Sequence, residues 1–440
     1  MAAKDYNEAV TDEWLVGCPH CDLLQRLPNL ASVASARCPR CNEELWRRRE
    51  DSLNRTLALA LAAAVFYVVA NSVPMLGLTV VGREASTTVL GGALHLWQSG
   101  QEMVALLVLF TAVVAPAMQI VLTLAIVLGA RRQPAPRWTG ALLRHHGTAL
   151  IWSMIEVMML GILVALVKIA DYATVIPGTA LFVLGGLIGL LAAMQASFEP
   201  REVWERIQWA QPPGKVGSRP QEWTGRMIDA GTLTAMQQGL QSCETCGLLS
   251  RPAAGAEEGR CPRCGEILEF RKRASTQRAW AFLIAAAICY IPANVLPVLT
   301  TTTAAGADSD TILQGVVLLW SPTGWPLSLI VLVASIMIPS AKILALGYLL
   351  IAVQRGSATS NEQRTRLYRM VRFIGRWSMV DVFVDTFTAA LVQLEPLMSV
   401  EAGPGLVFFA AVVVLTMLAV ESFDPRLIWD AASAMEAQHA

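Results

Sequence analysis

Eight of the nine cysteines fall into two copies of one pattern, and each copy stands directly before a set of long apolar segments. Each copy consists of two Cys-x-x-Cys pairs separated by a short stretch. A Cys-x-x-Cys pair places two thiolates on one tight turn, and two such turns can close a tetrahedral site around Zn²⁺. The sequence therefore predicts two structural zinc ribbons, with the ligands Cys18, Cys21, Cys38 and Cys41 in the first and Cys243, Cys246, Cys261 and Cys264 in the second.

Two other uses of paired cysteines fit this chain less well. Redox Cys-x-x-Cys motifs are usually single and begin a helix in a βαβ pattern, which neither copy shows. A disulfide framework requires an oxidising compartment, whereas the basic residues considered below place both ribbons in the cytoplasm. Cys289 stands alone in an apolar stretch and is interpreted as a small packing residue.

The composition is typical of a membrane protein. Of the 440 residues, 54% are hydrophobic and only 15% are charged, whereas soluble domains carry about a quarter charged residues. The formal net charge is zero, so no global charge indicates binding to nucleic acid. The charged residues gather in the ribbons and short connections, which leaves apolar stretches of about 20 residues. The polar segment 1–50 shows no cleavable signal peptide.

Eight apolar stretches are long enough to cross a membrane as α-helices. Basic residues cluster before the first and fifth stretch and after the second and sixth, whereas the loops on the other side hold Arg83 and almost no other cation. Both termini and both ribbons are therefore expected in the cytoplasm. His145 and His146 fall in one of the basic connections and are expected to be solvated. The spans are predicted near 57–76, 103–129, 148–169, 178–197, 280–299, 326–353, 378–398 and 403–421.

The chain is an internal duplication, because rare residues recur at a constant spacing. Matching elements of the two halves lie 223 residues apart as far as the second span and 225 residues apart after it. The predicted fold class is an α-helical integral membrane protein of two tandem repeats, each a cytoplasmic zinc ribbon plus four transmembrane helices. Parallel repeats of this kind are related by an axis along the membrane normal. The predicted domains are 1–50 (first ribbon), 51–200 (four helices), 201–242 (cytoplasmic linker), 243–270 (second ribbon), 271–425 (four helices) and 426–440 (cytoplasmic tail).

Four duplicated motifs carry a family resemblance. They are the cysteine ribbons, an Asn-x-x-Pro element in the first helix of each half, a Trp-Ser-Met-x-Asp/Glu element containing Glu156 and Asp381, and a Ser-Phe-Asp/Glu-Pro-Arg element after each fourth helix. Over essentially its whole length the chain resembles the paraquat-inducible protein A family. The resemblance implies an inner-membrane protein of Gram-negative bacteria. It also implies a periplasm-spanning MCE-domain protein as partner, whose tunnel moves membrane phospholipids between the two membranes.

Polar side chains at membrane depth are costly and are therefore candidates for function. Three of them, Asp381, Asp385 and Thr388, follow an i, i+4, i+7 spacing that places them on one helical stripe. A buried Lys342 that faces this stripe would be partnered by carboxylates. The predicted polar network of the second half is Ser335, Ser340, Lys342, Ser378, Asp381, Asp385, Thr388 and Thr416.

The first half lacks most of this network, since Gln119 stands at the position of Lys342 and Leu160 at that of Asp385. We therefore expect the C-terminal half to work and the N-terminal half to support it. One hypothesis is a proton relay that couples the proton gradient to lipid transfer. The alternative is a structural network, although hydrogen bonds in membranes contribute only about 1 kcal/mol each.

Asparagine and proline residues within the spans are predicted to kink or end helices, with direct contact to a substrate as the alternative. Proline bends a transmembrane helix and frees a backbone carbonyl, and asparagine can satisfy such a group. These predicted helix breaks are Asn71, Pro74, Pro116, Asn294, Pro297 and Pro339.

Enzyme signatures are missing, because the sequence has no P-loop, His-Glu-x-x-His or Gly-x-Ser-x-Gly motif. We therefore expect no catalytic activity. Two function classes remain. The first is a component of lipid transport that serves an MCE tunnel, and the second is a zinc-ribbon membrane scaffold or stress regulator that recruits cytoplasmic proteins. We favour the first, because a scaffold has no need of a polar network in the bilayer.

Overall fold

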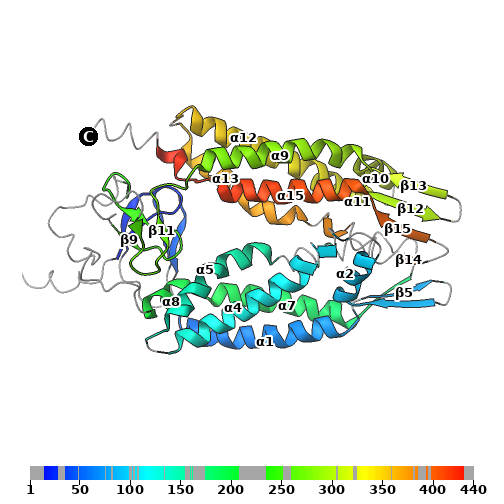
Figure 1. The fold of residues 1–440 in the computed structure, drawn as a ribbon, viewed down its shortest axis with the longest axis horizontal. Coiled ribbons are helices and arrows are strands. Elements are labelled where there is room, and N and C mark those ends of the chain that lie inside the picture. Colours follow the sequence, from blue (N-terminus) through cyan, green and yellow to red (C-terminus); the bar gives the residue numbers. More distant parts are fainter. Residues whose placement is uncertain are drawn as a thin grey trace, which may run out of the picture.

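The structure is a computed structural model in which two sets of helices run side by side, with both cysteine ribbons at one end and short β-sheets at the other (Figure 1). The residues that it describes are 14–27, 35–47, 49–74, 76–80, 83–98, 102, 105–106, 109–132, 134–153, 159, 161, 174–207, 234–250, 259–303, 306–320, 325–357, 359–379, 382–384, 393–394 and 398–430.

The first set of helices, called module 1, follows ribbon 1 in the chain. Its longest helices, α1 and α7, pack against each other, and α4 packs on α1 and α5. Its strands form a sheet in which β5 pairs antiparallel with both β6 and β7. The elements are α1 (Ser52–Ser72), β5 (Leu76–Val80), β6 (Arg83–Thr87), α2 (Val89–Gln98), η1 (Leu109–Val114), α4 (Ala115–Ala130), α5 (Arg137–Trp152), β7 (Thr174–Pro177), α7 (Thr179–Ser197) and α8 (Pro200–Arg206).

The second set, module 2, repeats this order after ribbon 2. Helix α9 packs against α15 as α1 does against α7. Strand β12 pairs with β13 and β15, and β15 also pairs with β14. The elements are α9 (Ser275–Val295), β12 (Leu299–Thr303), β13 (Gly306–Asp310), α10 (Ile312–Leu319), α11 (Trp325–Val331), η3 (Leu332–Met337), α12 (Ile338–Gln354), α13 (Asn361–Trp377), β14 (Gln393–Leu394), β15 (Met398–Ala402) and α15 (Pro404–Ser422).

The duplication seen in the sequence reappears as matching hydrogen bonds. Ser52 donates its hydroxyl to the carbonyl of Ser197 at 2.9 Å, and Ser275 donates in the same way to Ser422 at 2.9 Å. Each bond ties the start of the first long helix of a module to the end of the last one. The two modules are therefore copies of one fold, which confirms the predicted tandem repeat.

In each module a π-helical segment leads directly into a long helix whose second residue is proline. Pro116 lies in the first turn of α4 after η1, and Pro339 lies in the first turn of α12 after η3. Because proline has no N–H and its ring clashes with the preceding turn, a regular α-helical ladder cannot pass through this point. A tyrosine of the first helix bonds a carbonyl here, from Tyr67 to Val113 at 2.9 Å and from Tyr290 to Ile336 at 3.1 Å. The tyrosines satisfy backbone groups that apolar surroundings would otherwise leave unpaired.

Five helices among the described residues are long and apolar enough to cross a membrane. They are Ser52–Ser72, Thr179–Ser197, Ser275–Val295, Leu332–Gln354 and Pro404–Ser422, and Ala115–Ala130 is a shorter apolar helix. Large apolar side chains lie exposed on them, such as Phe182 at 72% and Leu344 at 73%. Such a surface suits contact with lipid. The chain is thus a mostly helical membrane protein, and the spans expected at 148–169 and 378–398 lie largely outside the described residues.

The structure differs from the sequence-based expectation in the connections. A three-stranded sheet forms beyond the end of α1 and a four-stranded sheet beyond the end of α9, where only loops were expected. The basic connections are helices rather than loops, because α5 begins at Arg137 and α13 at Asn361. Helix α8 occupies the start of the expected linker, and its Val203 and Trp204 are buried.

The junction between the sheet of module 2 and α15 requires glycine. The N–H of Gly405 donates to the carbonyl of Pro297 at 2.9 Å. A Cβ atom on Gly405 would lie 2.6 Å from the carbonyl oxygen of Leu296. The backbone of the Asn-x-x-Pro segment thus packs directly on the first turn of α15, and there is no room for a side chain at Gly405.

We expect Gly405→Ala to lower the unfolding temperature of the purified protein, because overpacking against backbone costs about 1–3 kcal/mol. Gly347→Ala is the matched control, since a Cβ there would lie 3.9 Å from Leu283, an ordinary contact. Thermal unfolding in detergent, followed by tryptophan fluorescence, measures both. Equal unfolding temperatures for the two variants would contradict the proposed backbone contact.

Candidate functional site

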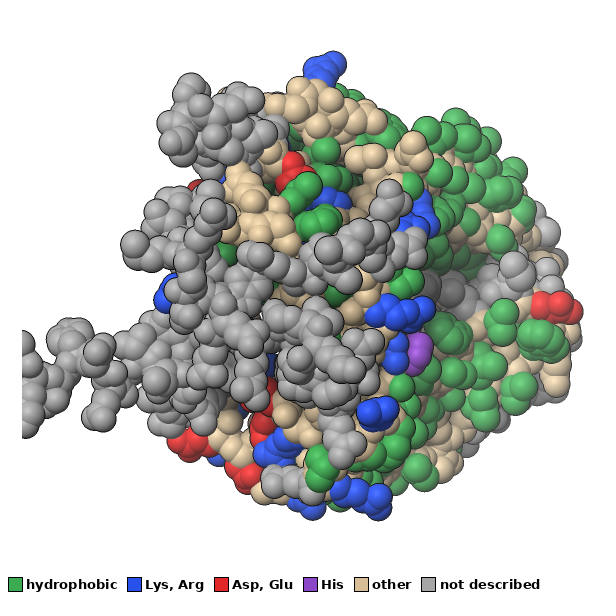
Figure 2. All heavy atoms as spheres, turned by 60° about the vertical axis from the view of Figure 1, so that its left-hand side comes forward, with side chains coloured by type: hydrophobic (Ala, Val, Ile, Leu, Met, Phe, Trp, Pro, Cys, Tyr) green, Lys and Arg blue, Asp and Glu red, His purple; other side chains and the backbone are tan. Residues whose placement is uncertain are grey.

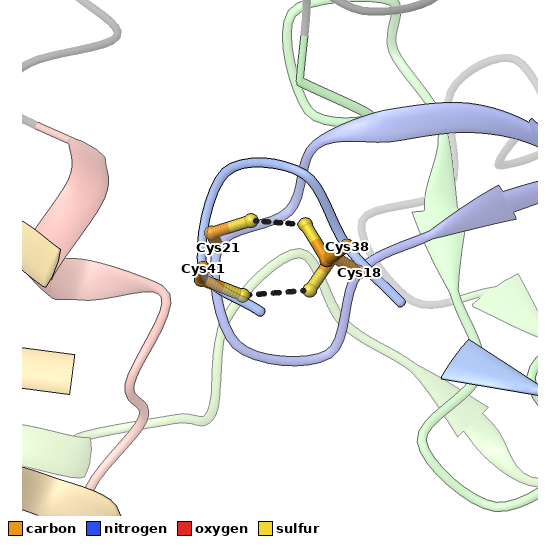
Figure 3. Close-up of side chains that lie close together, drawn as sticks. All are labelled: Cys18, Cys21, Cys38 and Cys41. Atoms are coloured by element: carbon orange, nitrogen blue, oxygen red, sulfur yellow. Dashed lines mark hydrogen bonds between the residues drawn. The ribbon is translucent and has the colours of Figure 1, made fainter. Parts of the chain in front are cut away.

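Each ribbon consists of two short hairpins, and each hairpin carries one cysteine pair in its turn. In ribbon 1, β1 (Trp14–Gly17) pairs with β2 (Leu24–Leu27), and β3 (Ser35–Arg37) pairs with β4 (Glu44–Arg47). In ribbon 2, β8 (Gln241–Ser242) pairs with β9 (Leu249–Ser250), and β10 (Gly259–Arg260) pairs with β11 (Ile267–Leu268). The two cysteine turns of a ribbon face each other, as Figure 3 shows for ribbon 1.

All four cysteine turns have the same backbone geometry. The residue after the second cysteine has a positive φ, and its N–H donates back to the carbonyl of the first cysteine at 2.8–2.9 Å. Ribbon 2 uses glycine at this position, which adopts the left-handed region without strain. Ribbon 1 uses aspartate and asparagine, the side chains that tolerate this region best. These residues are Asp22, Asn42, Gly247 and Gly265.

The eight cysteines form two compact sets of four sulfur atoms. In ribbon 1 the Sγ atoms of Cys18 and Cys41 are 3.4 Å apart, and those of Cys21 and Cys38 are 3.5 Å apart (Figure 3). All four sulfurs of each set lie within 4.8 Å of one another. A tetrahedral site with Zn–S bonds of about 2.3 Å requires sulfurs about 3.8 Å apart. Each set can therefore hold one metal ion in a closed four-thiolate site, and zinc fits this donor set.

The ribbons pack crosswise on the modules. The cysteines of ribbon 1 share one apolar core with module 2, including Leu346, Tyr368 and Phe423. The cysteines of ribbon 2 share a core with module 1, including Leu143 and Trp204. Each ribbon therefore shares its apolar core with the module that it does not directly precede in the chain, and polar contacts also join it to the module that it does precede. Figure 1 shows both ribbons at the same end of the two helix sets.

Polar contacts reinforce the packing of ribbon 1 on module 2. Arg369 of α13 donates to His20 Nδ1 at 3.2 Å and lies 3.1 Å from Glu43, and it also donates to the carbonyl of Cys41. The guanidinium of Arg40 stacks on Trp429 at 4.6 Å. Between ribbon 2 and module 1, Arg144 pairs with Glu266 at 3.3 Å. Arginine suits such contacts because it can bond and stack at the same time.

The Ser-Phe-Asp/Glu-Pro-Arg motifs lie at the same end, but they are bonded differently in the two modules. Asp424 accepts from Arg426 at 2.9 Å, and Arg426 also donates to Glu244 of ribbon 2 at 2.6 Å. Burial raises the pKa of Asp424, but the hydrogen bonds and charge of Arg426 outweigh burial and lower it. In module 1, Glu199 accepts instead from the indole of Trp46 at 2.8 Å.

The predicted polar network is only partly within the described residues. Lys342 is 2% exposed, and its Nζ donates to Ser378 Oγ at 3.2 Å, so the structure brings these two together. Asp381, Asp385 and Thr388 lie outside the described residues. Of the other described hydroxyls, Ser340 bonds Tyr290 at 2.8 Å and Thr416 donates to the carbonyl of Val413 in its own helix. Ser335 is buried.

Module 1 has a different arrangement at the equivalent place. Gln119 is fully buried, and its side-chain amide makes no hydrogen bond within the part of the chain that is described. The carbonyl of Gln119 accepts from Thr123, whose hydroxyl also bonds His146 Nε2 at 3.1 Å. The expectation that His146 is solvated was wrong, because α5 turns it inward against Phe198. The helix over Arg137–Trp152 was not predicted, because its basic residues indicated a solvated connection.

The predicted helix breaks lie where long helices end or change geometry. Helix α1 ends at Ser72, two residues before Pro74, and α9 ends at Val295, two residues before Pro297. Asn71 and Asn294 donate back to the carbonyls of Tyr67 and Tyr290, at 2.9 and 2.8 Å. The sequence analysis did not single out the two tyrosines, although their equal position in the two repeats was available as a signal.

The fold and the cysteine sites together define a class: a helical membrane protein of two tandem modules, braced by two four-cysteine ribbons. The chain belongs to the paraquat-inducible protein A family, because the family model described as "Paraquat-inducible protein A" matches residues 53–208 and 276–433. The two matched segments correspond to the two modules.

Curated relatives span nearly the whole chain. "Lipophilic envelope-spanning tunnel protein A" of Escherichia coli K12 is 31% identical over 414 residues, which cover 94% of this chain and 91% of the relative. "Intermembrane transport protein PqiA" of the same organism is 31% identical over 413 residues, which cover 94% and 95%. "Probable intermembrane transport protein" of Haemophilus influenzae is 28% identical over 422 residues, which cover 94% and 95%. No solved structure matches the chain.

The crossed packing predicts which module is destabilised when each metal site is lost. In ribbon 1, Cys38→Ser together with Cys41→Ser should speed amide exchange in α13 of module 2, because metal binding stabilises the ribbon that covers it. In ribbon 2, Cys261→Ser together with Cys264→Ser should instead speed exchange in α8 of module 1. Hydrogen–deuterium exchange with mass spectrometry measures both variants.

Each double variant serves as the control for the other. Faster exchange confined to the module that directly follows the altered ribbon in the chain would refute the crossed arrangement. Metal content, measured on the same samples, should fall from two ions per chain to one in both variants.

Proposed function

We propose that this chain is the inner-membrane component of an intermembrane lipid-transport system, which passes phospholipids to or from a periplasmic MCE-domain tunnel. The observation that carries the proposal is the match to proteins named for intermembrane transport and for an envelope-spanning tunnel, over 94% of the chain. The apolar helices support a role within the bilayer. The basic residues beside the spans favour a cytoplasmic position for the ribbons and both termini.

The two metal sites have a structural role in this proposal, with Zn²⁺ as the ion. Four thiolates fill a tetrahedral shell and leave no open position for a substrate. The ribbons cover the ends of the helices and cross between the modules. They therefore hold the two modules in one relative position while the apolar parts contact lipid.

Lys342 is the residue of the second module on which we base the transport step. It is 2% exposed in an apolar helix, and among the described residues Ser378 is its hydrogen-bond partner. An ammonium group held at this depth is costly unless acceptors surround it. We infer that Asp381 and Asp385 complete its surroundings and that the group relays protons during lipid transfer.

We expect Lys342→Met to reduce lipid transfer about tenfold or more, because it removes the ionisable group and leaves the carboxylates without their cation. Gln119→Met is the matched control, since Gln119 is buried at the equivalent position of module 1. Transfer of a fluorescent phospholipid between membranes, in the presence of the MCE-domain partner, is the measurement. Unchanged transfer by a normally expressed Lys342→Met protein would rule out the relay.

The partner itself is tested by purification of the full chain from membranes. The proposal expects an MCE-domain protein and bound phospholipid in the purified complex. Ribbons that instead capture a cytoplasmic protein, in a complex without phospholipid, would support the scaffold function and contradict the transport role.

A further inference from the structure

A cavity of about 670 Å³ lies at the ribbon end, where both ribbons meet the ends of both modules. Its walls come from ribbon 1, from ribbon 2, from the segments that follow α7 and α15, and from the segment that leads into α9. Figure 2 shows this end of the molecule, with Lys and Arg side chains gathered along the border between the ribbon end and the apolar surface.

Equivalent residues of the two repeats line this cavity from two sides. Arg49 precedes α1 and Lys272 precedes α9, at the same position of each repeat. The backbone N–H of Lys272 donates to Asp424 at 3.1 Å, and that of Arg49 donates to Glu199. The acidic residue of each Ser-Phe-Asp/Glu-Pro-Arg motif thus fixes the backbone of a cation at the cavity wall. The duplicated motif therefore has a structural role at the cavity wall.

The carboxylates that line the cavity all have partners. Asp424 and Glu244 are bonded by Arg426, Glu421 by Arg372 at 3.3 Å, Glu44 by Arg47 at 2.8 Å, and Glu199 by the indole of Trp46. Four of these five carboxylates are paired with arginine, whereas Glu199 accepts from a neutral indole and from the backbone N–H of Arg49.

Three of the lining cations have no carboxylate within ion-pair distance in the described part of the chain. They are Arg49, Arg263 and Lys272, which come from three different segments. Lys272 Nζ donates to the carbonyl of Glu421 at 3.0 Å, which is a neutral acceptor. Arg263 is 8% exposed; its Nη2 donates to the carbonyl of Cys246, the thiolates of ribbon 2 are its nearest negative groups, and its Nε has no hydrogen-bond partner among the described residues. Positive charge with unused donors thus converges on one cavity.

Arg49 and Lys272 are partly buried without a carboxylate partner, which is costly, whereas a bound anion would pair with them. Phosphate oxygens suit these groups, because guanidinium bonds them in a bidentate manner and ammonium attracts them as a point charge. We propose that this cavity binds an anionic ligand through a phosphate group held by Arg49, Arg263 and Lys272. The phosphate belongs either to a phospholipid headgroup or to a soluble phosphate compound. The site stands independently of whether the chain transports lipid.

A second cavity of about 380 Å³ adjoins the first and shares His20, Gln195, Arg372 and Glu421 with it. Leu150 of module 1 and Phe373 of module 2 are among its apolar lining residues. The second cavity combines apolar side chains, such as Leu150 and Phe373, with charged ones, such as Arg369. A phospholipid would place its headgroup in the first cavity and its acyl chains toward the second, whereas a soluble phosphate compound would need only the first.

The test uses Arg49→Gln together with Lys272→Gln in the full chain, because Arg263 also lies beside the thiolates of ribbon 2. Isothermal titration calorimetry in dodecyl maltoside measures binding of inorganic phosphate and of dihexanoyl phosphatidylglycerol. We expect saturable binding by the unaltered chain and a Kd raised about tenfold or more in the double variant. Arg278→Gln, an exposed cation of α9 outside the cavity, should leave the Kd unchanged. Metal content and unfolding temperature confirm that the variants are folded.

The two probes separate the sources of phosphate. Tighter binding of the short-chain lipid, weakened by Phe373→Ala, assigns the site to a phospholipid headgroup. Equal or tighter binding of inorganic phosphate, unaffected by Phe373→Ala, assigns it to a soluble compound. The absence of saturable binding of both probes, or an unchanged Kd in the folded double variant, would overturn the proposal.

Discussion

The crossed packing of the ribbons on the helix ends is the constraint on which the arrangement of this protein depends. Each four-cysteine site stabilises a small fold that could not exist on its own apolar core. That fold then covers the apolar ends of helices from the other repeat, with Tyr368 and Phe423 beneath ribbon 1. Because each ribbon directly precedes one module in the chain and shares its apolar core with the other, the two repeats cannot separate without exposing both cores.

Several parts of this arrangement could be predicted from the sequence, because their signals are local. The cysteine spacing predicted both four-sulfur sites, and the constant offset between halves predicted the tandem repeat. The crossed packing could not be predicted, since it depends on contacts such as that between Arg369 and His20, which are far apart in the chain. The sheets next to α1 and α9 were missed because threonine-rich or polar stretches such as Leu299–Thr303 read as loops until a partner strand is known.

The two modules share a backbone but differ in their buried polar groups. Lys342 bonds Ser378 in module 2, whereas Gln119 and His146 occupy the corresponding region of module 1. The Ser-Phe-Asp/Glu-Pro-Arg motifs differ in the same way, with an internal ion pair at Asp424 and an indole partner at Glu199. Duplication thus supplied one scaffold twice, and side-chain changes within it produced two different chemical environments.

The π-helical segments ahead of Pro116 and Pro339 also change which face of α4 and α12 each side chain occupies. A π-turn contains one residue more than an α-turn, so every later side chain is rotated by roughly 100° relative to an uninterrupted helix. Helical wheels drawn straight through η3 would therefore assign Lys342 to the wrong face. Its inward direction follows from this local unwinding, which the phenol of Tyr290 holds in place.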